Sequence, residues 1–266
     1  MTKRKKGKSE PVDDLIEIGS DIAGGTAGAA LGFFTAGPAG AVLGGATAPL
    51  LVHTFRKMAS EIRHRYLGVR EEVRIGATIA FAARKIQENI ANGQQIRQDG
   101  FFETQPGERA AAEEVLEALL LVAQREHQEK KLPFYGNLLA NIAFHHEIDR
   151  AYANLLIRLG DQISYRQMCL LVLFASQRKD GYHLRQEDYR SASTTADTIA
   201  LLQEIYELYS QGMLNASGEA LLGIGDVKPA KMKVQGTGAM LCNLMELWRI
   251  ESLREEDLIE TAILLR

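Results

Sequence analysis

The side chains that could form a zinc site of the common histidine and cysteine type in this chain are six histidines and two cysteines. They are His53, His64, His127, His145, His146, His183, Cys169 and Cys242. Zinc sites use such residues at short fixed spacings, for example two histidines one helical turn apart with an acid between them, or a C-x-x-C pair. Neither spacing occurs here. The sequence therefore predicts no metal site.

Acidic and histidine-containing stretches give no pattern typical of a catalytic site. The pairs Glu113-Glu114 and Glu187-Asp188 lie in polar contexts that are typical of solvated faces. His145, His146 and Glu147 follow a predicted helix, whose C-terminus favours positive charge, so we interpret them as a cap. The G-x-S-x-G motif of serine hydrolases and the kinase motifs do not occur. We expect a protein without enzymatic activity and without a cofactor.

The compartment is indicated by the cysteines and by the N-terminal sequence. Cys169 and Cys242 lie far apart within apolar runs, which is typical of free buried thiols in a reducing cytosol. The first apolar stretch follows a long polar leader and lacks the cleavage pattern of a secretory signal. Both features predict a cytoplasmic protein.

Charge is unevenly distributed along the chain, although the formal net charge is only −3. Residues 1–10 hold five Lys or Arg and one acid, and residues 56–97 hold nine basic and four acidic side chains. Residues 98–266 hold seventeen basic and twenty-five acidic ones. Basic flanks of this kind favour an anionic membrane or an acidic partner. The residues that we expect at a membrane surface are Lys3, Arg4, Lys5, Lys6, Lys8, Arg56 and Lys57.

An uncharged, glycine-rich segment, residues 22–52, separates the two basic regions. Each glycine costs a helix about 1 kcal/mol relative to alanine, so the nine glycines within residues 19–45 need an offsetting gain. Small residues recur here at every fourth position, which places them on one helix face and lets two backbones approach closely. The residues that we expect in this zipper are Gly24, Gly28, Gly32, Gly40 and Gly44. The spacing predicts association between helices.

Two membrane geometries fit this segment, and both remain open. A single span over residues 31–52 has the better length, with kinks at Pro38 and Pro49. A hairpin with its hinge at Gly37 and Pro38 has short arms, but basic flanks on both sides favour it. Insertion is expected to be weak alone and favoured by assembly, which is typical of a conditional pore former. A glycine-rich hairpin buried in a soluble core or subunit interface is the alternative.

The rest of the sequence predicts a mainly α fold. After a basic connector over residues 56–73, apolar periodicity predicts a helical bundle. Its expected helices cover residues 71–92, 108–130, 133–144, 149–160 and 164–176. Three further helices are expected over residues 195–210, 237–249 and 254–265, with a turn-rich stretch over residues 214–234.

The order helix, short β-wing, helix is the outline of a winged-helix module. Binding of DNA by such a module needs a basic recognition helix or wing. Residues 183–250 hold six basic and eight acidic side chains, and the only local basic cluster is Lys228, Lys231 and Lys233. We therefore expect the module to bind proteins or to dimerise, and we do not expect nucleic acid as a partner.

The stretch Glu129 to Gln177 combines a Lys-rich lead, the core GNLLANIAF and the helix YRQMCLL. This part, about a fifth of the chain, resembles uncharacterised bacterial all-helical proteins of the type encoded near antiviral defence systems. Together with the glycine-rich segment, it resembles membrane-acting effectors that stop infected cells by depolarisation. The resemblance implies a role in antiphage defence and supplies no catalytic residue.

These patterns predict three parts: a basic tail and membrane-directed glycine-zipper segment (1–55), a self-contained helical bundle (56–180) and a winged-helix-like module (181–266). We expect a homo-oligomeric effector, conditionally or stably associated with the bacterial inner membrane, that forms a pore or disrupts the membrane. A regulatory protein encoded nearby is an expected partner. The alternative is a soluble scaffold or adaptor that uses the glycine-rich helices as an assembly interface. A winged-helix transcription regulator is the third hypothesis.

Overall fold

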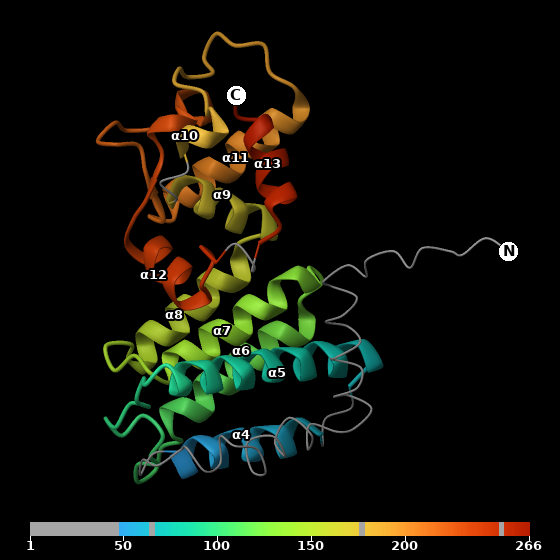
Figure 1. Cartoon of the computed structure of the whole chain (residues 1–266), viewed down its shortest axis with the longest axis vertical. Coiled ribbons are helices and arrows are strands. Elements are labelled where there is room, and N and C mark those ends of the chain that lie inside the picture. The colour runs from blue at the N-terminus through green and yellow to red at the C-terminus, as the bar shows by residue number, and fades with distance from the viewer. Residues whose placement is uncertain (1–47, 64–66, 176–178, 250–252) are drawn as a thin grey trace, which may run out of the picture. The chain divides into compact units, whose positions relative to one another are not determined.

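The computed structural model describes residues 48–63, 67–175, 179–249 and 253–266 (Figure 1). These residues are mainly helical, so the predicted mainly α class is confirmed. The described residues form two compact units: unit 1 comprises those up to residue 157, and unit 2 comprises those from residue 158 onward. In the sequence, the division between them falls within α8 (Arg150–Gln162). The predicted boundaries after residues 55 and 180 fall inside α4 and α10, respectively.

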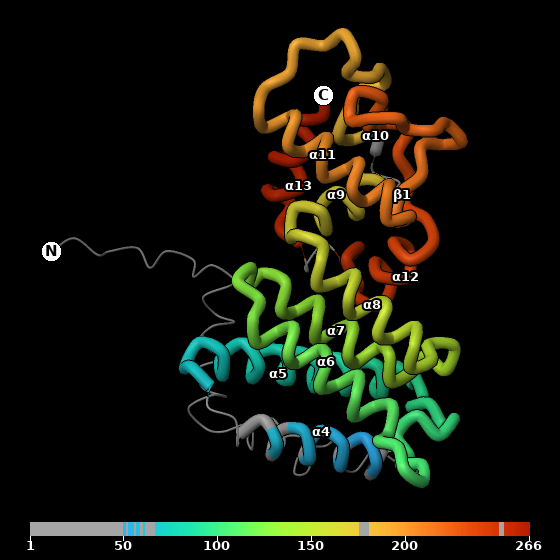
Figure 2. Tube along the Cα trace, turned by 180° about the vertical axis from the view of Figure 1, so that it is seen from behind, coloured from blue at the N-terminus to red at the C-terminus, as the bar shows by residue number. Residues whose placement is uncertain are grey.

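Unit 1 is a packed set of helices. Its elements are α4 (Ala48–Arg63), α5 (Val69–Ala91), α6 (Ala111–Arg125), the short 3-10 helix η1 (Glu129–Lys131), α7 (Leu132–Ile142) and the start of α8. Helices α5, α6 and α7 pack against one another, and α4 packs on α6 (Figures 1 and 2). The described residues preceding α5 therefore belong to this unit.

Helix α4 occupies part of the region that we expected to be a basic connector. Its apolar residues Leu51, Phe55 and Met58 recur at the spacing of one helix face and are at most 5% exposed. This face packs on α6. The last residues of the expected membrane span, 48–52, thus begin an amphipathic helix of a folded unit.

Among the described residues, no helix is both long enough and apolar enough to cross a membrane. On this finding, the predictions of a transmembrane helix and of pore formation are wrong. Helix α4 shows the physical reason. Arg56, Lys57 and Glu61 interrupt its apolar sequence, and its apolar face is covered by protein. The earlier part of the expected segment, residues 22–47, lies outside the described residues.

Helices α5 and α7 cross at very close range. A Cβ atom placed on Gly136 of α7 would lie 2.3 Å from Phe81 Cβ and 2.9 Å from the backbone nitrogen of Ala82 in α5. Only a glycine fits at this point without displacing a backbone. Small residues therefore bring two helix backbones together inside unit 1.

Unit 2 is organised around α9 (Tyr165–Ala175). Residues 167–174 are all buried, as expected for a helix that is apolar on every side. Around α9 pack α11 (Ala196–Ser210), α12 (Gly236–Met245) and α13 (Glu255–Ile263), while α10 (Lys179–Tyr182) contacts α13. The core of unit 2 is thus formed on one helix that all its larger neighbours share.

A small antiparallel sheet lies at the ends of the stretch that we expected to be turn-rich. Strand β1 (Leu214–Asn215) pairs with β2 (Lys233–Val234), and Leu214 lies opposite Val234. Between them are the 3-10 helices η2 (Ile224–Asp226) and η3 (Pro229–Lys231). Each strand has only two residues, so the structure supports the mainly helical class rather than a particular module.

Candidate functional site

Most of the residues that we expected at a functional site lie outside the described part of the chain. These are the zipper residues Gly24, Gly28, Gly32, Gly40 and Gly44, the hinge residues Gly37 and Pro38, and the basic residues Lys3, Arg4, Lys5, Lys6 and Lys8. Arg56 and Lys57 lie in α4. The structure therefore places only these two of the expected residues.

Lys57 takes part in a charge cluster within unit 1. Its Nζ lies 2.6 Å from Oε2 of Glu113, a carboxylate on α6 whose side chain is only 4% exposed. Arg109 also lies 3.6 Å from the same carboxylate and pairs with Glu117 at 2.7 Å. A buried carboxylate needs such partners because burial penalises its charge. Lys57 thus neutralises Glu113 and helps to fix α4 on α6.

The end of the α5–α7 crossing is held by buried polar groups. Asn89 Nδ2 of α5 donates a hydrogen bond of 2.8 Å to Asn141 Oδ1 of α7. Both side chains are buried, so each would lose a hydrogen bond without the other. This pair fixes how far one helix can slide along the other.

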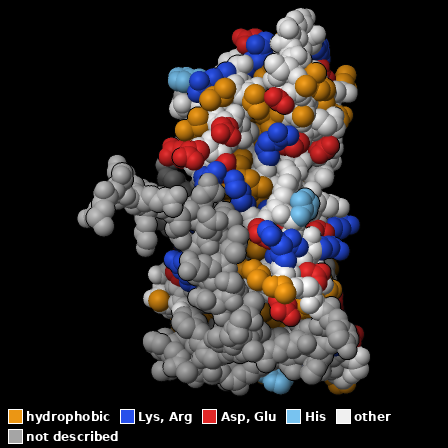
Figure 3. Space-filling view, turned by 90° about the vertical axis from the view of Figure 1, so that its right-hand side faces the viewer, with side chains coloured by type: hydrophobic (Ala, Val, Ile, Leu, Met, Phe, Trp, Pro, Cys, Tyr) orange, Lys and Arg blue, Asp and Glu red, His pale blue; other side chains and the backbone are white. Residues whose placement is uncertain are grey.

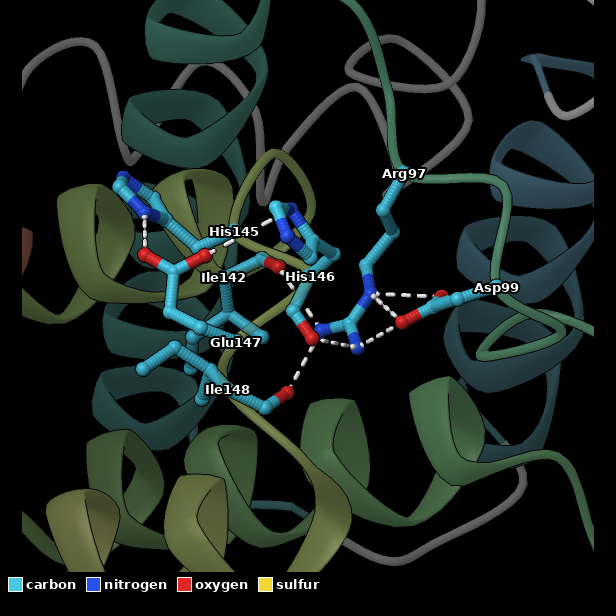
Figure 4. Close-up of polar contacts among 7 residues, drawn as sticks. All are labelled: Arg97, Asp99, Ile142, His145, His146, Glu147 and Ile148. Carbon is cyan, nitrogen blue, oxygen red and sulfur yellow. Dashed lines mark hydrogen bonds and ion pairs between the residues drawn. The ribbon is translucent and has the colours of Figure 1, made fainter.

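Arg97, in the loop after α5, clamps the turn that follows α7 (Figure 4). Its guanidinium donates hydrogen bonds to the carbonyl oxygens of Ile148 at 2.6 Å and of His146 at 3.3 Å. A longer bond of 3.4 Å reaches Ile142 O at the end of α7. Asp99 balances the charge through a 2.5 Å ion pair, and the guanidinium also stacks 4.0 Å from the centre of the Phe101 ring. Arg97 therefore supplies the positive charge at the C-terminus of α7 that we had expected from the histidines.

The clamped turn presents His145, His146 and Glu147 to solvent (Figure 4). His145 Nδ1 shares a hydrogen bond of 2.5 Å with Glu147 Oε1, and His146 Nδ1 lies 3.7 Å from the other carboxylate oxygen. The hydrogen bond with His145 holds the pKa of the Glu147 carboxyl below its ordinary value. All three side chains are at least 43% exposed, so this is a surface ion pair on a rigid turn.

A second buried cluster closes the loop between α6 and α7. Glu126 Oε2 accepts hydrogen bonds from Tyr135 Oη at 2.7 Å and pairs with Lys131 Nζ at 2.6 Å, while Gln128 N–H donates to Oε1. Burial opposes ionisation of Glu126, but these donors outweigh it and hold its pKa below the ordinary value. Because Glu126 adopts an extended backbone to make these contacts, α6 ends at Arg125 rather than at Lys130 as expected.

In unit 2, the basic cluster that nucleic acid would need is largely neutralised. Lys228 and Lys231 each place Nζ 2.6 Å from a carboxylate oxygen of Glu219. Their hydrogen bonds lower the pKa of Glu219 to about 2. Lys233 lies outside this triad. These two lysines form ion pairs with an acid of the same loop, and the pairs hold the loop together.

The thiols and the metal-binding residues can be assessed only in the described part of the chain. Cys169 and Cys242 are both free and buried, which confirms the expected state of the cysteines. Burial raises the pKa of Cys242 to about 12, so its thiol stays protonated at neutral pH. Within the described ranges, no group of three or more His, Cys, Asp or Glu side chains is arranged to hold a metal ion.

The sequence alone did not indicate two polar clusters of unit 1, one centred on Arg97 and the other on Glu126. Arg97 stands alone among the loop residues QQIRQDG, and only the nearby Asp99 hinted at a pair. Glu126 and Lys131 lie five residues apart, a spacing that suggested no pair on the helix we had expected there. The Arg97 contacts join segments far apart in sequence, whereas Glu126 meets residues two to nine positions further along the chain.

Comparison with known proteins finds no family model, no curated protein and no solved structure that matches this chain.

Proposed function

We propose that this protein is a self-assembling scaffold or adaptor, in which copies join through the small-residue register at Gly24, Gly28, Gly32, Gly40 and Gly44. The observation that carries the proposal is the α5–α7 crossing at Gly136, where the same chain uses a small residue to bring two helices into contact in a protein core. Residues four apart lie on the same face of a helix, so glycines at this spacing would allow two helices to approach as closely as α5 and α7 do.

The crossing supports assembly between protein surfaces rather than insertion into lipid. A glycine weakens an isolated helix by about 1 kcal/mol relative to alanine, so it needs close packing to be tolerated. At Gly136, that packing comes from Phe81 and Ala82 of α5. A second copy of the chain would supply it to the zipper residues.

The proposal is tested by the size of the assembly in solution. Gly28→Leu and Gly32→Leu put bulk on the register, whereas Ala30→Leu and Ala41→Leu put the same bulk off it and serve as matched controls. We expect light scattering after gel filtration to show an oligomer for the wild-type protein and the controls, and a monomer for the glycine variants. Equal mass for all five proteins would contradict the proposal.

We further propose that unit 2 is a winged-helix-like module that contacts proteins. Helix α11 would be its recognition helix, since β1, the first strand of the small sheet, is the next element after it. It carries Asp197, Glu204 and Glu207 but no Lys or Arg, so its charge opposes a phosphate backbone. This charge favours a protein partner.

Peripheral attachment to an anionic membrane is a second candidate function, favoured by the basic residues of positions 1–10. Each Lys or Arg near such a surface contributes about 1 kcal/mol. We expect the full chain to sediment with phosphatidylglycerol vesicles at low salt and not with phosphatidylcholine vesicles. Replacing Lys3, Arg4, Lys5, Lys6 and Lys8 by Gln should abolish sedimentation. A role in antiphage defence stays a prediction.

A further inference from the structure

Helix α13 presents an apolar pair to solvent on the face opposite its packed side. Leu258, Thr261 and Ala262 are buried against unit 2, whereas Ile259 and Ile263 are 40% and 52% exposed. Residues four apart lie next to each other on a helix surface, so the two isoleucines form one stripe. Large aliphatic side chains at adjacent positions of a helix are typical anchors for a second helix.

The stripe is held on a fixed support. At the start of α13, Asp257 accepts a hydrogen bond of 2.9 Å from Tyr165 Oη of α9 and pairs with Arg254 at 3.3 Å. At its end, Leu265 O accepts a hydrogen bond of 2.8 Å from the Arg185 backbone N–H. Both ends of the helix are therefore tied to unit 2, and a partner would not have to order the helix on binding.

Acidic side chains surround the stripe. Glu255, Glu256 and Glu260 are all exposed. At 100° per residue, Ile259 and Ile263 fall in the middle of the exposed arc, with Glu255 at one edge and Glu256 and Glu260 on the other side. In the described part of the chain, no Lys or Arg pairs with any of these three carboxylates. Figure 3, which views the side where α13 lies in Figure 1, shows apolar, acidic and basic side chains close together on unit 2.

This combination of charges selects the occupant. A second copy of α13 would bring three carboxylates against three others, and like charges facing each other across an interface are unfavourable. The basic N-terminal residues 1–10 have complementary charge, but after Met1 they contain no large apolar side chain to cover the isoleucines. The surface needs a partner with both features.

We propose that α13 docks a cationic amphipathic helix of another protein, with Ile259 and Ile263 as the apolar anchors and Glu255, Glu256 and Glu260 as the charge complement. This inference goes beyond self-assembly and does not depend on the glycine register. Burial of the anchors would give the affinity, while the carboxylates would give the orientation and the rate of association.

The probe for the test is a synthetic helical peptide of 18 residues with leucines along one face and lysines beside them, labelled for fluorescence anisotropy. A matched peptide with glutamates in place of the lysines reports the charge requirement. We expect the full-length protein to bind the lysine peptide, to bind it less tightly as salt increases, and not to bind the glutamate peptide.

Three variants separate the parts of the proposal. The double variant Ile259→Asn and Ile263→Asn should weaken binding by about tenfold or more, since it removes both anchors. The triple variant Glu255→Gln, Glu256→Gln and Glu260→Gln should weaken binding and flatten its dependence on salt. Leu121→Asn is the matched control, because Leu121 is 39% exposed on α6, which belongs to no proposed binding surface. It should leave the affinity unchanged.

Circular dichroism of each variant should match that of the wild-type protein, because all the changed side chains point to solvent. The proposal is overturned if the double variant binds as tightly as the wild type, or if Leu121→Asn weakens binding equally. It is also overturned if the glutamate peptide binds as well as the lysine peptide. A fall in oligomer mass caused by the double variant would assign the stripe to a second copy instead.

Discussion

The two units differ in what they bury. Among the described residues, unit 1 buries the charged side chains of Lys85, Arg97, Glu113, Glu126 and Lys131. The buried polar side chains of unit 2 are all uncharged and are Gln167, Thr198 and Thr261. A buried charge lowers stability unless it is paired with good geometry, so unit 1 depends on its pairs. Unit 2 depends on apolar packing around α9.

This difference indicates how each unit specifies its structure. In unit 1, the polar contacts join segments that are distant in sequence, as when Arg97 reaches Ile148 O and Lys57 reaches Glu113. A shift of one helix would leave a charge buried without a partner, so a particular helix arrangement is favoured. In unit 2, close packing of apolar side chains around α9 selects the arrangement.

The largest expected effect comes from removing the inner face of α4. A protein that starts at Ala48 keeps Leu51 and Phe55, whereas one that starts at Arg56 loses both. Loss of a buried Leu or Phe costs about 2–5 kcal/mol each, which is comparable to the whole stability of a domain. We expect hydrogen exchange to show unprotected α5–α7 amides in the shorter protein and unchanged α9 amides. If the amides of α5–α7 and those of α9 all stay protected in the shorter protein, the core of unit 1 does not depend on α4.

A smaller effect is expected from breaking one ion pair in each unit. Lys131→Met leaves the Glu126 carboxylate buried without its cation and should cost about 3–5 kcal/mol. Arg166→Met in unit 2 breaks a pair with Glu204 whose side chains are 42% and 20% exposed, and should cost less than about 1 kcal/mol. Urea unfolding measures both losses. Equal losses would remove the contrast between the units.

A matched double variant checks that pairing, rather than packing, causes the loss in unit 1. Lys131→Met combined with Glu126→Gln removes both charges and should recover most of the stability lost by Lys131→Met alone. No recovery would mean that the aliphatic stem of Lys131 matters more than its charge.

The contrast between the units also explains which parts of the fold could be predicted. Helices of unit 2 follow local signals: Thr195 caps α11 by accepting a hydrogen bond from Thr198 N–H, and α9 is an uninterrupted apolar run from Met168 onward. These signals lie within a few residues of the element they define. The expected helix over residues 195–210 and the observed α11 therefore agree closely.

Unit 1 was harder to predict because its polar contacts form between elements rather than within one helix. The end of α6 depends on Glu126 meeting Lys131 and Tyr135 of the two elements that follow, a contact that no spacing within α6 indicates. Helix α4 is amphipathic, but glycine-rich sequence on one side and basic residues on the other obscured its period. The exposed stripe of α13 could not be predicted, because the apolar residues of this stretch are alike in the sequence. Only the structure shows that Leu258, Ala262 and Leu265 are buried, while Ile259 and Ile263 are exposed.

Acidification should weaken unit 1 before unit 2. The pKa of Glu126 lies below its ordinary value of 4.5, so the stability it contributes is present above that value and is lost as pH falls through the lower folded pKa. Each unit of pKa shift corresponds to about 1.4 kcal/mol. Protonation also leaves Lys131 buried without its counter-charge. The groups of lowered pKa in unit 2, Glu219 and Asp226, lie on its surface loop.

Hydrogen exchange between pH 5 and 2 measures this order. Amides of α5 and α7 should lose protection first, while those of α9 keep theirs. The double variant Glu126→Gln with Lys131→Met should lose much of this acid sensitivity, since the titrating pair is gone. Earlier loss of protection in α9 would show that unit 2 holds the more acid-sensitive core.

The smallest effect is expected at the surface of unit 2, where charges are paired in the open rather than buried. Glu219→Gln should leave the thermal midpoint unchanged, because Glu219 is exposed, but it releases Lys228 and Lys231 beside Lys233. Released lysines bind phosphates in a salt-dependent way, so affinity for a short DNA duplex at low salt should rise a few-fold and vanish at higher salt. Glu255→Gln changes the net charge equally without releasing a lysine, and should leave DNA binding unchanged. If both variants raise DNA affinity alike, the weak DNA binding of the wild-type protein is caused by its overall charge rather than by the pairing of Glu219 with Lys228 and Lys231.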